Sequence, residues 1–311
     1  MRLASLAPVM SLSIAAVERD TGLSKDTLRV WERRYGFPSP QRDTIGERAY
    51  PLDQVERLRI VKRLLDAGHR PGRVVALPLR TLEQLAVSTV DHPQRAAEVV
   101  LAAADLRHLV DLVLQHDAVC LRQELSRLLA RQGVGGFVAD VVAPLNRAVG
   151  DAWMRGQLQV FEEHLYSEVV QSALRQALAS IPMPATSNPP RVLLTTLPGE
   201  PHGLGLLMAE AVLALEGAVC VSLGVQTPLR DVVLAAAAMK VQIVAIGFSG
   251  CLSLKQVQDG LAELRAQLPS DVQLWAGGST PGLQRRPIEG VTVLTTLAQI
   301  PHELHPRRAG T

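Results

Sequence analysis

The sequence predicts a multidomain fold, α and α/β, in which a helix-turn-helix, a four-helix bundle and a doubly wound parallel sheet follow one another. Three patterns carry this prediction. Two short helices around a tight glycine turn come first. Amphipathic helical repeats fill the middle, and buried-strand runs that alternate with helical runs come last. With 311 residues, the chain is long enough for two or three domains of this kind.

Bulk composition limits the class of protein. Hydrophobic residues make up 47% of the chain and aromatic residues only 3%, so the cores must consist mainly of leucine, valine and alanine. The 3 cysteines, Cys120, Cys220 and Cys251, have neither the spacing of a zinc site nor that of a disulfide framework, which fits a reducing cytoplasm. We expect no apolar run long enough to span a membrane, and residues 1–10 are predicted to be a leader without the features of a signal peptide.

A helix-turn-helix domain is predicted over residues 11–80. A helix over 11–20 and a glycine turn precede a second helix, Lys25–Tyr35, for which Ser24 is a suitable N-cap. A short basic hairpin follows over residues 41–50, and then a further helix.

The charge of this region is uneven with respect to the rest of the chain. Residues 11–80 contain 14 Lys and Arg against 9 Asp and Glu, a net charge of about +5, whereas the whole chain carries +2. A positive helix-turn-helix indicates a surface that binds the phosphates of nucleic acid.

The stretch from Thr27 to Arg42, together with Gly46-Glu47-Arg48-Ala49-Tyr50, resembles the winged helix-turn-helix of the MerR family. The resemblance covers Leu12 to about Leu77 and implies double-stranded promoter DNA as a partner, with Leu28 and Trp31 in the core. It also implies a set of side chains that enter the major groove or hold phosphates. They are Lys25, Thr27, Arg29, Arg33, Arg42, Arg48 and Tyr50.

Residues 94–180 are predicted to form a four-helix bundle. Apolar residues repeat at helical spacing in four runs, with breaks at 116–117, 132–136 and 150–161. The preceding stretch, 71–93, has poor periodicity and is predicted to be a link. After the bundle, residues 181–190 contain four prolines and are predicted to be a linker.

The last domain, residues 191–305, is predicted to be a flavodoxin-like doubly wound parallel sheet. Its first strand is followed by a loop with Glu200 and His202 and by an apolar helix that starts near Gly205. Ligands of such sheets bind at the carboxyl ends of the strands. Histidine is a common metal ligand, a carboxylate can orient it, and a glycine lets a large planar ligand approach the backbone.

Two later strand ends extend this motif. Ser249-Gly250-Cys251 follows one predicted strand, and Gly277-Gly278 closes the next. The three elements in this order are similar to the cobalamin-binding domain of methionine synthases, corrinoid mutases and light-sensing regulators. That family more often has aspartate where Glu200 stands and leucine at the place of Cys251. The resemblance implies that His202 is the lower axial ligand of cobalt, with the dimethylbenzimidazole tail near Ser249 and Gly277-Gly278.

In the predicted bundle, the spacing from Trp153 to Glu163-His164 resembles the signature of light-sensing cobalamin regulators of the CarH and LitR type. The resemblance implies adenosylcobalamin as the cofactor, with Trp153 against the adenosyl group and Glu163 and His164 in the same pocket. Those regulators carry a histidine directly after the tryptophan, where this chain has Met154. A thioether is a poor ligand for Co(III), so a bis-histidine state requires His164 or another residue. A bilin as second chromophore remains an alternative.

Together, the three modules predict a cytoplasmic transcription regulator, in the simplest case a repressor, that senses light through adenosylcobalamin. Light is expected to change its self-association as a dimer or tetramer and thereby release DNA. Two alternatives stay open, a sensor of cobalamin abundance and a corrinoid methyl carrier, and the basic first domain argues against the carrier. The sequence contains no recognisable general acid–base constellation or nucleophile elbow, so we expect no enzyme.

Overall fold

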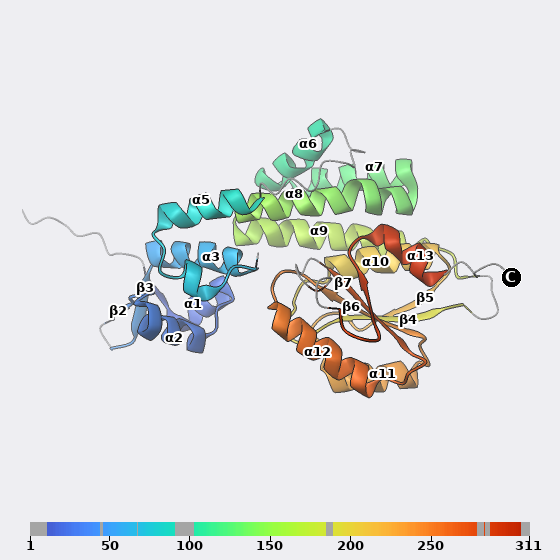
Figure 1. The fold of residues 1–311 in the computed structure, drawn as a ribbon. Helices are drawn as coiled ribbons and strands as arrows, with labels where there is room; N and C mark the ends of the chain where they lie inside the picture. The colour runs from blue at the N-terminus through green and yellow to red at the C-terminus, as the bar shows by residue number, and fades with distance from the viewer. Residues whose placement is uncertain are drawn as a thin grey trace, which may run out of the picture. The chain divides into compact units, whose positions relative to one another are not determined.

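In the computed structural model, the described residues are 11–43, 46–66, 68–90, 103–184, 189–278, 283 and 287–305. They form two compact units, which we describe separately (Figure 1). The N-terminal unit combines the chain up to residue 96 with residues 151–160, and the C-terminal unit contains the rest. The leader predicted over 1–10 and the first part of the predicted bundle, up to residue 102, lie outside the described residues.

The N-terminal unit begins with a strand, β1 (Ser11–Ser13), and helix α1 (Ile14–Thr21). The prediction of one helix over 11–20 is wrong at its start. Ser13 caps α1 by accepting a hydrogen bond from the Ala16 amide, and the residues before it pair with strand β3 (Arg48–Pro51). Helix α2 (Lys25–Tyr35) has its predicted bounds, because the Ser24 side chain accepts from the Thr27 amide at its start.

Strands β2 (Gln41–Arg42) and β3 form the predicted antiparallel hairpin, and β1 completes the sheet in the order β1-β3-β2. Helix α3 (Leu52–Asp66) follows. The prediction of a link over 71–93 is wrong, because α4 (Pro71–Val74) and α5 (Leu79–Val90) occupy most of it. Leu82 and Ala86 of α5 are buried with α3, and their spacing of four places them on one face of the helix.

The helices of the C-terminal unit are α6 (Ala103–Leu114), α7 (Ala118–Gly136), the π-helix η1 (Phe137–Val142), α8 (Ala143–Met154) and α9 (Val160–Ala179). The predicted breaks between α6 and α7 and between α8 and α9 are present. The third lies at Gly133, whose φ of 69° and ψ of 175° are not helical, although the helix resumes at once through η1 into α8. The last residues of α8 group with the N-terminal unit.

One helical stretch among the described residues, Ala118–Met154, meets the length and hydropathy of a membrane span, contrary to the expectation from sequence. Its apolar side chains nevertheless serve the core of the unit. Leu121, Leu125, Phe137 and Val141 are fully buried, and α7 and η1 pack against helix α10 (Leu204–Leu215). The stretch therefore has the features of core helices in a bundle.

Five parallel strands form the sheet of the C-terminal unit: β4 (Arg191–Thr196), β5 (Val219–Ser222), β6 (Ile243–Phe248), β7 (Gln273–Gly278) and β8 (Val291–Leu294). Their order is β5-β4-β6-β7-β8, which confirms the predicted flavodoxin-like, doubly wound topology. The winding direction reverses between β4 and β6, so their carboxyl ends border a crevice in which such folds bind ligands.

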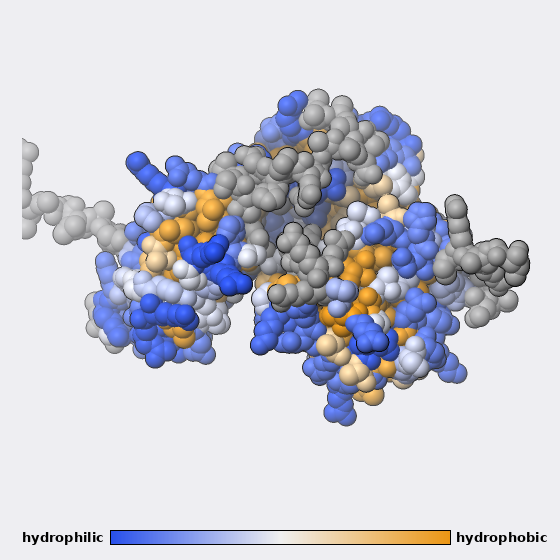
Figure 2. Space-filling view, in the orientation of Figure 1, coloured by the Kyte–Doolittle hydropathy of each residue, from blue (hydrophilic) through white to orange (hydrophobic). Residues whose placement is uncertain are grey.

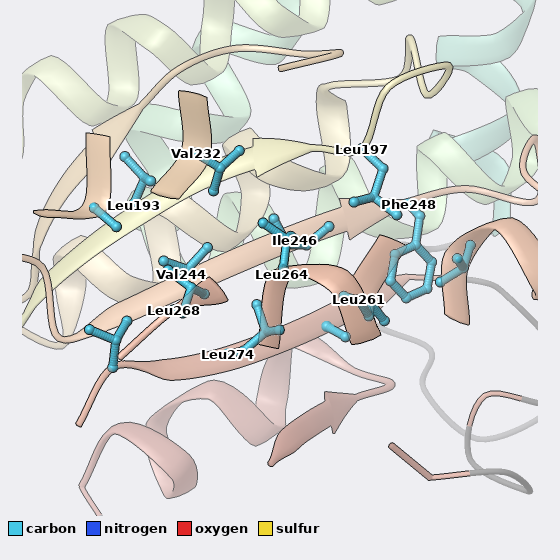
Figure 3. Close-up of a cluster of buried hydrophobic side chains, with 14 of the residues drawn as sticks. Leu193, Leu197, Val232, Val244, Ile246, Phe248, Leu261, Leu264, Leu268 and Leu274 are labelled. Atoms are coloured by element: carbon cyan, nitrogen blue, oxygen red, sulfur yellow. The ribbon is translucent and has the colours of Figure 1, made fainter. Parts of the chain in front are cut away.

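Helices cover both faces of this sheet (Figure 1). On one face, α11 (Leu229–Ala238) and α12 (Leu254–Gln267) pack on the strands, and Figure 3 shows leucine, valine and isoleucine side chains of strands and helices turned toward one another. On the other face lie α10, the short 3-10 helix η2 (Leu297–Gln299) and α13 (Ile300–Leu304). Figure 2, drawn in the orientation of Figure 1, shows hydrophobic residues at the surface of the C-terminal unit.

Candidate functional site: a corrinoid cavity and a basic winged domain

The loops after β4 and β6 bring Glu200, His202 and Ser249 together. The Glu200 side chain is fully buried, and its Oε1 accepts a hydrogen bond from Nδ1 of His202 at 2.7 Å. Its Oε2 accepts from the backbone amide of Ser249 at 2.7 Å, and the Ser249 hydroxyl donates to the same oxygen at 2.9 Å. The His202 amide donates to Oε1 at 3.1 Å, so the carboxylate is held from several directions and in turn orients the imidazole.

The surroundings of Glu200 favour its ionised form. Burial alone raises the pKa of Glu200, but the hydrogen bonds from His202 and the Ser249 amide outweigh it, and the pKa lies below its usual value. An ionised Glu200 keeps the imidazole proton on Nδ1, so Nε2 of His202 carries the lone pair that a metal would use. The His202 side chain is 55% exposed, so this ligand atom is presented outside the buried network.

His202 lies on the wall of a cavity of about 770 Å³ in the C-terminal unit, on the face of the sheet that α10 covers. Its inner wall is apolar and includes Leu194, Leu206 and Trp275. The cavity brings together most of the predicted cofactor residues, and Glu200 supports it from behind His202. The predicted residues on its wall are Glu163, His164, His202, Gly205, Ser249, Gly277 and Gly278.

Glycines create the space at the carboxyl ends of the strands. A Cβ at Gly205 would meet no atom within 4 Å, and one at Gly277 would come no closer than 3.9 Å to another atom, so both positions leave room that a side chain would fill. At Gly278, glycine is required for a different reason. Its φ is +146°, and a Cβ there would overlap the backbone oxygen of Phe248 on β6.

This set of residues fits a corrinoid. A neutral imidazole oriented by a buried carboxylate suits cobalt, and an apolar slot beside glycines suits a large ligand with a flat tail. Cys251 is a third possible metal ligand, since its sulfur and the ligand atoms of Glu200 and His202 lie within 4.8 Å of one another. The oxygens of Glu200 already accept hydrogen bonds, so His202 is the residue best placed to bind cobalt.

Helix α9 supplies a polar part of the cavity wall. Glu163 accepts a hydrogen bond from the Ser167 hydroxyl, one turn later, at 2.6 Å. His164 is 71% exposed and its Nε2 lies 3.8 Å from Glu163. The sequence analysis missed Ser167, although its spacing of four from Glu163 places both on one face of the helix.

Trp153 and Met154 belong to the N-terminal unit. The Trp153 ring stacks with the guanidinium of Arg63, whose Cζ lies 4.4 Å from the ring centroid, and Met154 packs against the hydrophobic core of that unit. Neither is among the described residues that line the cavity. Their place at the upper face of the cofactor stays a prediction.

Helix α2 carries four of the predicted DNA-binding residues. Lys25 and Arg29 have side chains 44% and 49% exposed, and each forms an ion pair with an acidic neighbour, at 3.5 and 3.3 Å. Arg33 is exposed, and the Thr27 hydroxyl lies 2.8 Å from that of Ser24 at the start of the helix. Exposed ion pairs contribute little stability, so these cations can exchange their partners for phosphates.

The hairpin holds its two arginines in different ways. Arg42 is exposed, and its Nη1 donates to the backbone oxygen of Gly46 at 2.7 Å. Arg48 donates from Nε to Glu32 of α2 at 2.8 Å, and this hydrogen bond raises the pKa of Arg48. The hairpin is thereby fixed to the helix that precedes it.

The position of Tyr50 contradicts the prediction that its side chain contacts a DNA phosphate. The side chain is fully buried in the hydrophobic core with Leu28 and Trp31, and burial raises its pKa. Its hydroxyl has no hydrogen-bond partner among the described residues. Residues two apart on a strand share a face, so Tyr50 points inward on the same side of β3 as the half-buried Arg48.

Two family models match the chain. Residues 12–77 match the MerR HTH family regulatory protein, and residues 105–177 match the B12 binding domain. The chain is 29% identical over 267 residues to the HTH-type transcriptional repressor CarH of Myxococcus xanthus, covering 83% of this chain and 85% of the relative. It is also 29% identical over 278 residues to CarA of the same organism, over 88% and 90%.

The chain thus combines a MerR-type helix-turn-helix domain with a B12-binding domain, and over most of its length it is similar to the CarH and CarA repressors. The first match makes it a DNA-binding protein, and the second supports cobalamin as its cofactor. The relatives CarH and CarA are both named as transcriptional repressors, which agrees with the predicted regulator.

The fold of the regulator's C-terminal unit has a counterpart among solved structures. It is similar to the Methanosarcina barkeri monomethylamine corrinoid protein, with a TM-score of 0.53 and 16% identity, over 65% of this chain and 98% of that one. At this identity the likeness concerns the fold alone, and it confirms the predicted combination of helices with a parallel sheet.

Proposed function

We propose that this regulator is a cytoplasmic, light-dependent repressor that uses adenosylcobalamin and changes its oligomeric state when illuminated. The observation that carries the proposal is the cavity itself, which combines His202 on its Glu200 support with Glu163 and His164 of the helical part. A cofactor held by His202 would have these two α9 residues within the same enclosure.

When bound, adenosylcobalamin supplies a cobalt–carbon bond that light breaks, with loss of the adenosyl group. His202 holds the cofactor from the sheet side in both states, because Glu200 and Ser249 orient its imidazole. Glu163 and His164 contact the adenosyl group, and Trp153 packs against it. A ligand shifts an equilibrium only through contacts that differ between states, and these three side chains provide that difference.

Self-association links this change to DNA. In the dark, an oligomer holds several basic winged domains at one operator, and the loss of one subunit contact removes the gain in effective concentration from all of them. The cations Lys25, Arg29 and Arg33 of α2 bind the operator in this arrangement, with Arg42 on the hairpin.

The first experiment combines an absorption spectrum with size determination. Protein loaded with adenosylcobalamin is measured in the dark and after green illumination, and its binding to promoter DNA is followed in both states. We expect an alkylcobalamin spectrum that changes together with oligomer size and DNA affinity. A change in the spectrum without a change in size or DNA binding would contradict the proposal.

Two alternatives stay open. Met154, which stands where light-sensing relatives carry histidine, keeps open the use of a bilin as an additional chromophore. Separately, the regulator could measure the abundance of cobalamin rather than light. Cobalamin binding that changes DNA affinity equally in light and dark identifies the abundance sensor. A long-wavelength absorption band of the purified protein identifies the bilin.

A further inference from the structure

Arg63, near the end of α3, is a buried cation that has no carboxylate partner among the described residues. It is 5% exposed, its Nε has no hydrogen-bond partner, and it takes part in none of the ion pairs between described residues. By contrast Arg59, one turn earlier, pairs with Asp20 at 2.7 Å. Burial lowers the pKa of Arg63 to about 10, so the side chain remains charged at neutral pH. A buried charge of this kind is costly unless another group compensates it.

The segment 151–160 supplies that compensation. The Trp153 ring lies 4.4 Å from the guanidinium carbon, a geometry in which the π face attracts the cation. At the edge of the guanidinium lies Gly156, where a Cβ would come within 2.9 Å of Nη1 of Arg63. Gly156 has a φ of +72°, so the chain turns closely around the cation.

Arg63 also has other potential partners close by. A cavity of about 130 Å³ adjoins it, lined by the carboxylates of Glu56 and Glu83 and by the arginines Arg59 and Arg155. If the Trp153 ring leaves, the guanidinium has carboxylates toward which it can turn. The stacked arrangement and a turn toward these carboxylates would be the two states that a switch element requires.

We propose that Arg63 is a positioning residue that holds Trp153 against the DNA-binding unit, and that the adenosyl group of the cofactor competes with Arg63 for the same face of the indole. The inference rests on the proposed function, which assigns Trp153 to the adenosyl group. One indole face cannot stack on both partners. Binding of adenosylcobalamin therefore releases Arg63 in the DNA-binding unit, and by linkage the state of Arg63 sets the affinity for the cofactor.

The first test examines the contact without any cofactor. Arg63→Met removes the charge and keeps an apolar stem, and Arg155→Met is the matched control, because it removes one exposed charge from the same small cavity. Trp31 and Trp275 are 5% and 2% exposed, so quenching of tryptophan fluorescence by acrylamide reports mainly on Trp153. We expect increased quenching for Arg63→Met and none for Arg155→Met. Equal quenching of Arg63→Met and the wild type would overturn the proposed hold on Trp153.

The second test measures competition. Dissociation constants for adenosylcobalamin and hydroxocobalamin are determined in the dark, and hydroxocobalamin serves as the probe that lacks the adenosyl group. Since the cation–π contact no longer opposes binding, Arg63→Met should bind adenosylcobalamin about 3- to 10-fold more tightly. Its affinity for hydroxocobalamin should not change. In a Trp153→Ala background the same substitution should have no effect on either ligand.

The outcomes separate this inference from the proposed function. A wild-type protein that binds adenosylcobalamin and responds to light, with an Arg63→Met variant of unchanged affinity, contradicts the inference alone. An equal gain for both cobalamins, or a gain that persists without Trp153, also contradicts it. A wild-type protein that ignores light contradicts the proposed function, whatever Arg63 does. Arg63→Gln, which keeps a polar group, repeats the measurement if Arg63→Met does not fold.

Discussion

The two residues expected to meet opposite faces of the cofactor, His202 and Trp153, have environments of different construction. His202 is fixed by Glu200, a buried acid that accepts hydrogen bonds from two residues. Trp153 makes a single described aromatic contact, with an arginine that has carboxylates nearby as other potential partners. The comparison suggests different roles for the two sides, in which the His202 side binds the cofactor permanently and the Trp153 side reports the state of the cofactor.

Among the substitutions that test this comparison, Gly278→Ala should have the largest effect. A Cβ there overlaps the Phe248 backbone, and because these two residues are paired between β6 and β7, relief requires the strands to separate. We expect a loss of about 3 kcal/mol or more of folding free energy, together with loss of cobalamin binding. Denaturant unfolding measures the first and absorption titration the second. Gly277→Ala is the control, because a Cβ there finds space, and a similar loss of stability in both variants would refute the argument.

The second prediction concerns the ligand itself. His202→Ala removes the nitrogen donor, and the bound cofactor should lose the spectrum of a histidine-ligated cobalamin, with at least about 100-fold weaker binding. Stability of the cofactor-free protein should change little, because the His202 side chain is 55% exposed. His164→Ala is the comparison on the other side, for which we expect retained binding of hydroxocobalamin. Loss of binding in both variants to the same degree would remove the distinction between the sides.

A smaller effect should follow from Glu200→Gln, which keeps the shape of the side chain but removes its charge. Loss of a group that orients a metal ligand typically costs about 10- to 100-fold in affinity. Glu200→Asp, the residue more common in this motif, should retain more of the affinity because it keeps the carboxylate. Titrations with hydroxocobalamin decide this, and equal affinities of both variants would show that charge is unimportant here.

The same residue predicts a pH dependence of the cofactor-free protein. The pKa of Glu200 is lower in the folded state than its ordinary value of 4.5. Its ionised form therefore contributes stability that is fully present above that value and is lost as the pH falls through the lower, folded pKa. Acid unfolding of Glu200→Gln should lack this component, so the difference in stability from the wild type should shrink toward low pH.

The sequence permitted prediction of the His202 side but not of the Arg63 contact, for a physical reason. Glu200 and Ser249 each follow a strand and Gly277 lies at the end of one, and the ends of parallel strands meet at one edge, so local patterns sufficed to bring them together. Arg63 and Trp153 are ninety positions apart on helices of different predicted domains, and no period connects them. Arg63 itself follows an ordinary helical pattern, and only its burial distinguishes it.

The predictions for residues 11–13, for helix α5 and for Tyr50 were wrong for related reasons. The segment Ser11–Ser13 is only three residues long, and pairing with β3 makes it a strand in spite of the helical pattern that follows. Helix α5 escaped prediction because its partners, on α3, are distant in sequence. Tyr50 was assigned to DNA from its position in a motif, whereas the register of β3 turns it inward.

Tyr50 provides the smallest predicted effect and tests that last point. Its buried hydroxyl has no hydrogen-bond partner among the described residues, so Tyr50→Phe removes an unsatisfied polar group and leaves the ring in place. We expect unfolding free energy to rise or stay within about 1 kcal/mol, with unchanged DNA affinity. Arg42→Ala is the contrasting variant, because the exposed charge of Arg42 should strengthen DNA binding. Removal of this charge should weaken binding and reduce the slope of log affinity against log salt by about 1. Weaker DNA binding by Tyr50→Phe, with a normal fold, would restore the tyrosine to the DNA surface.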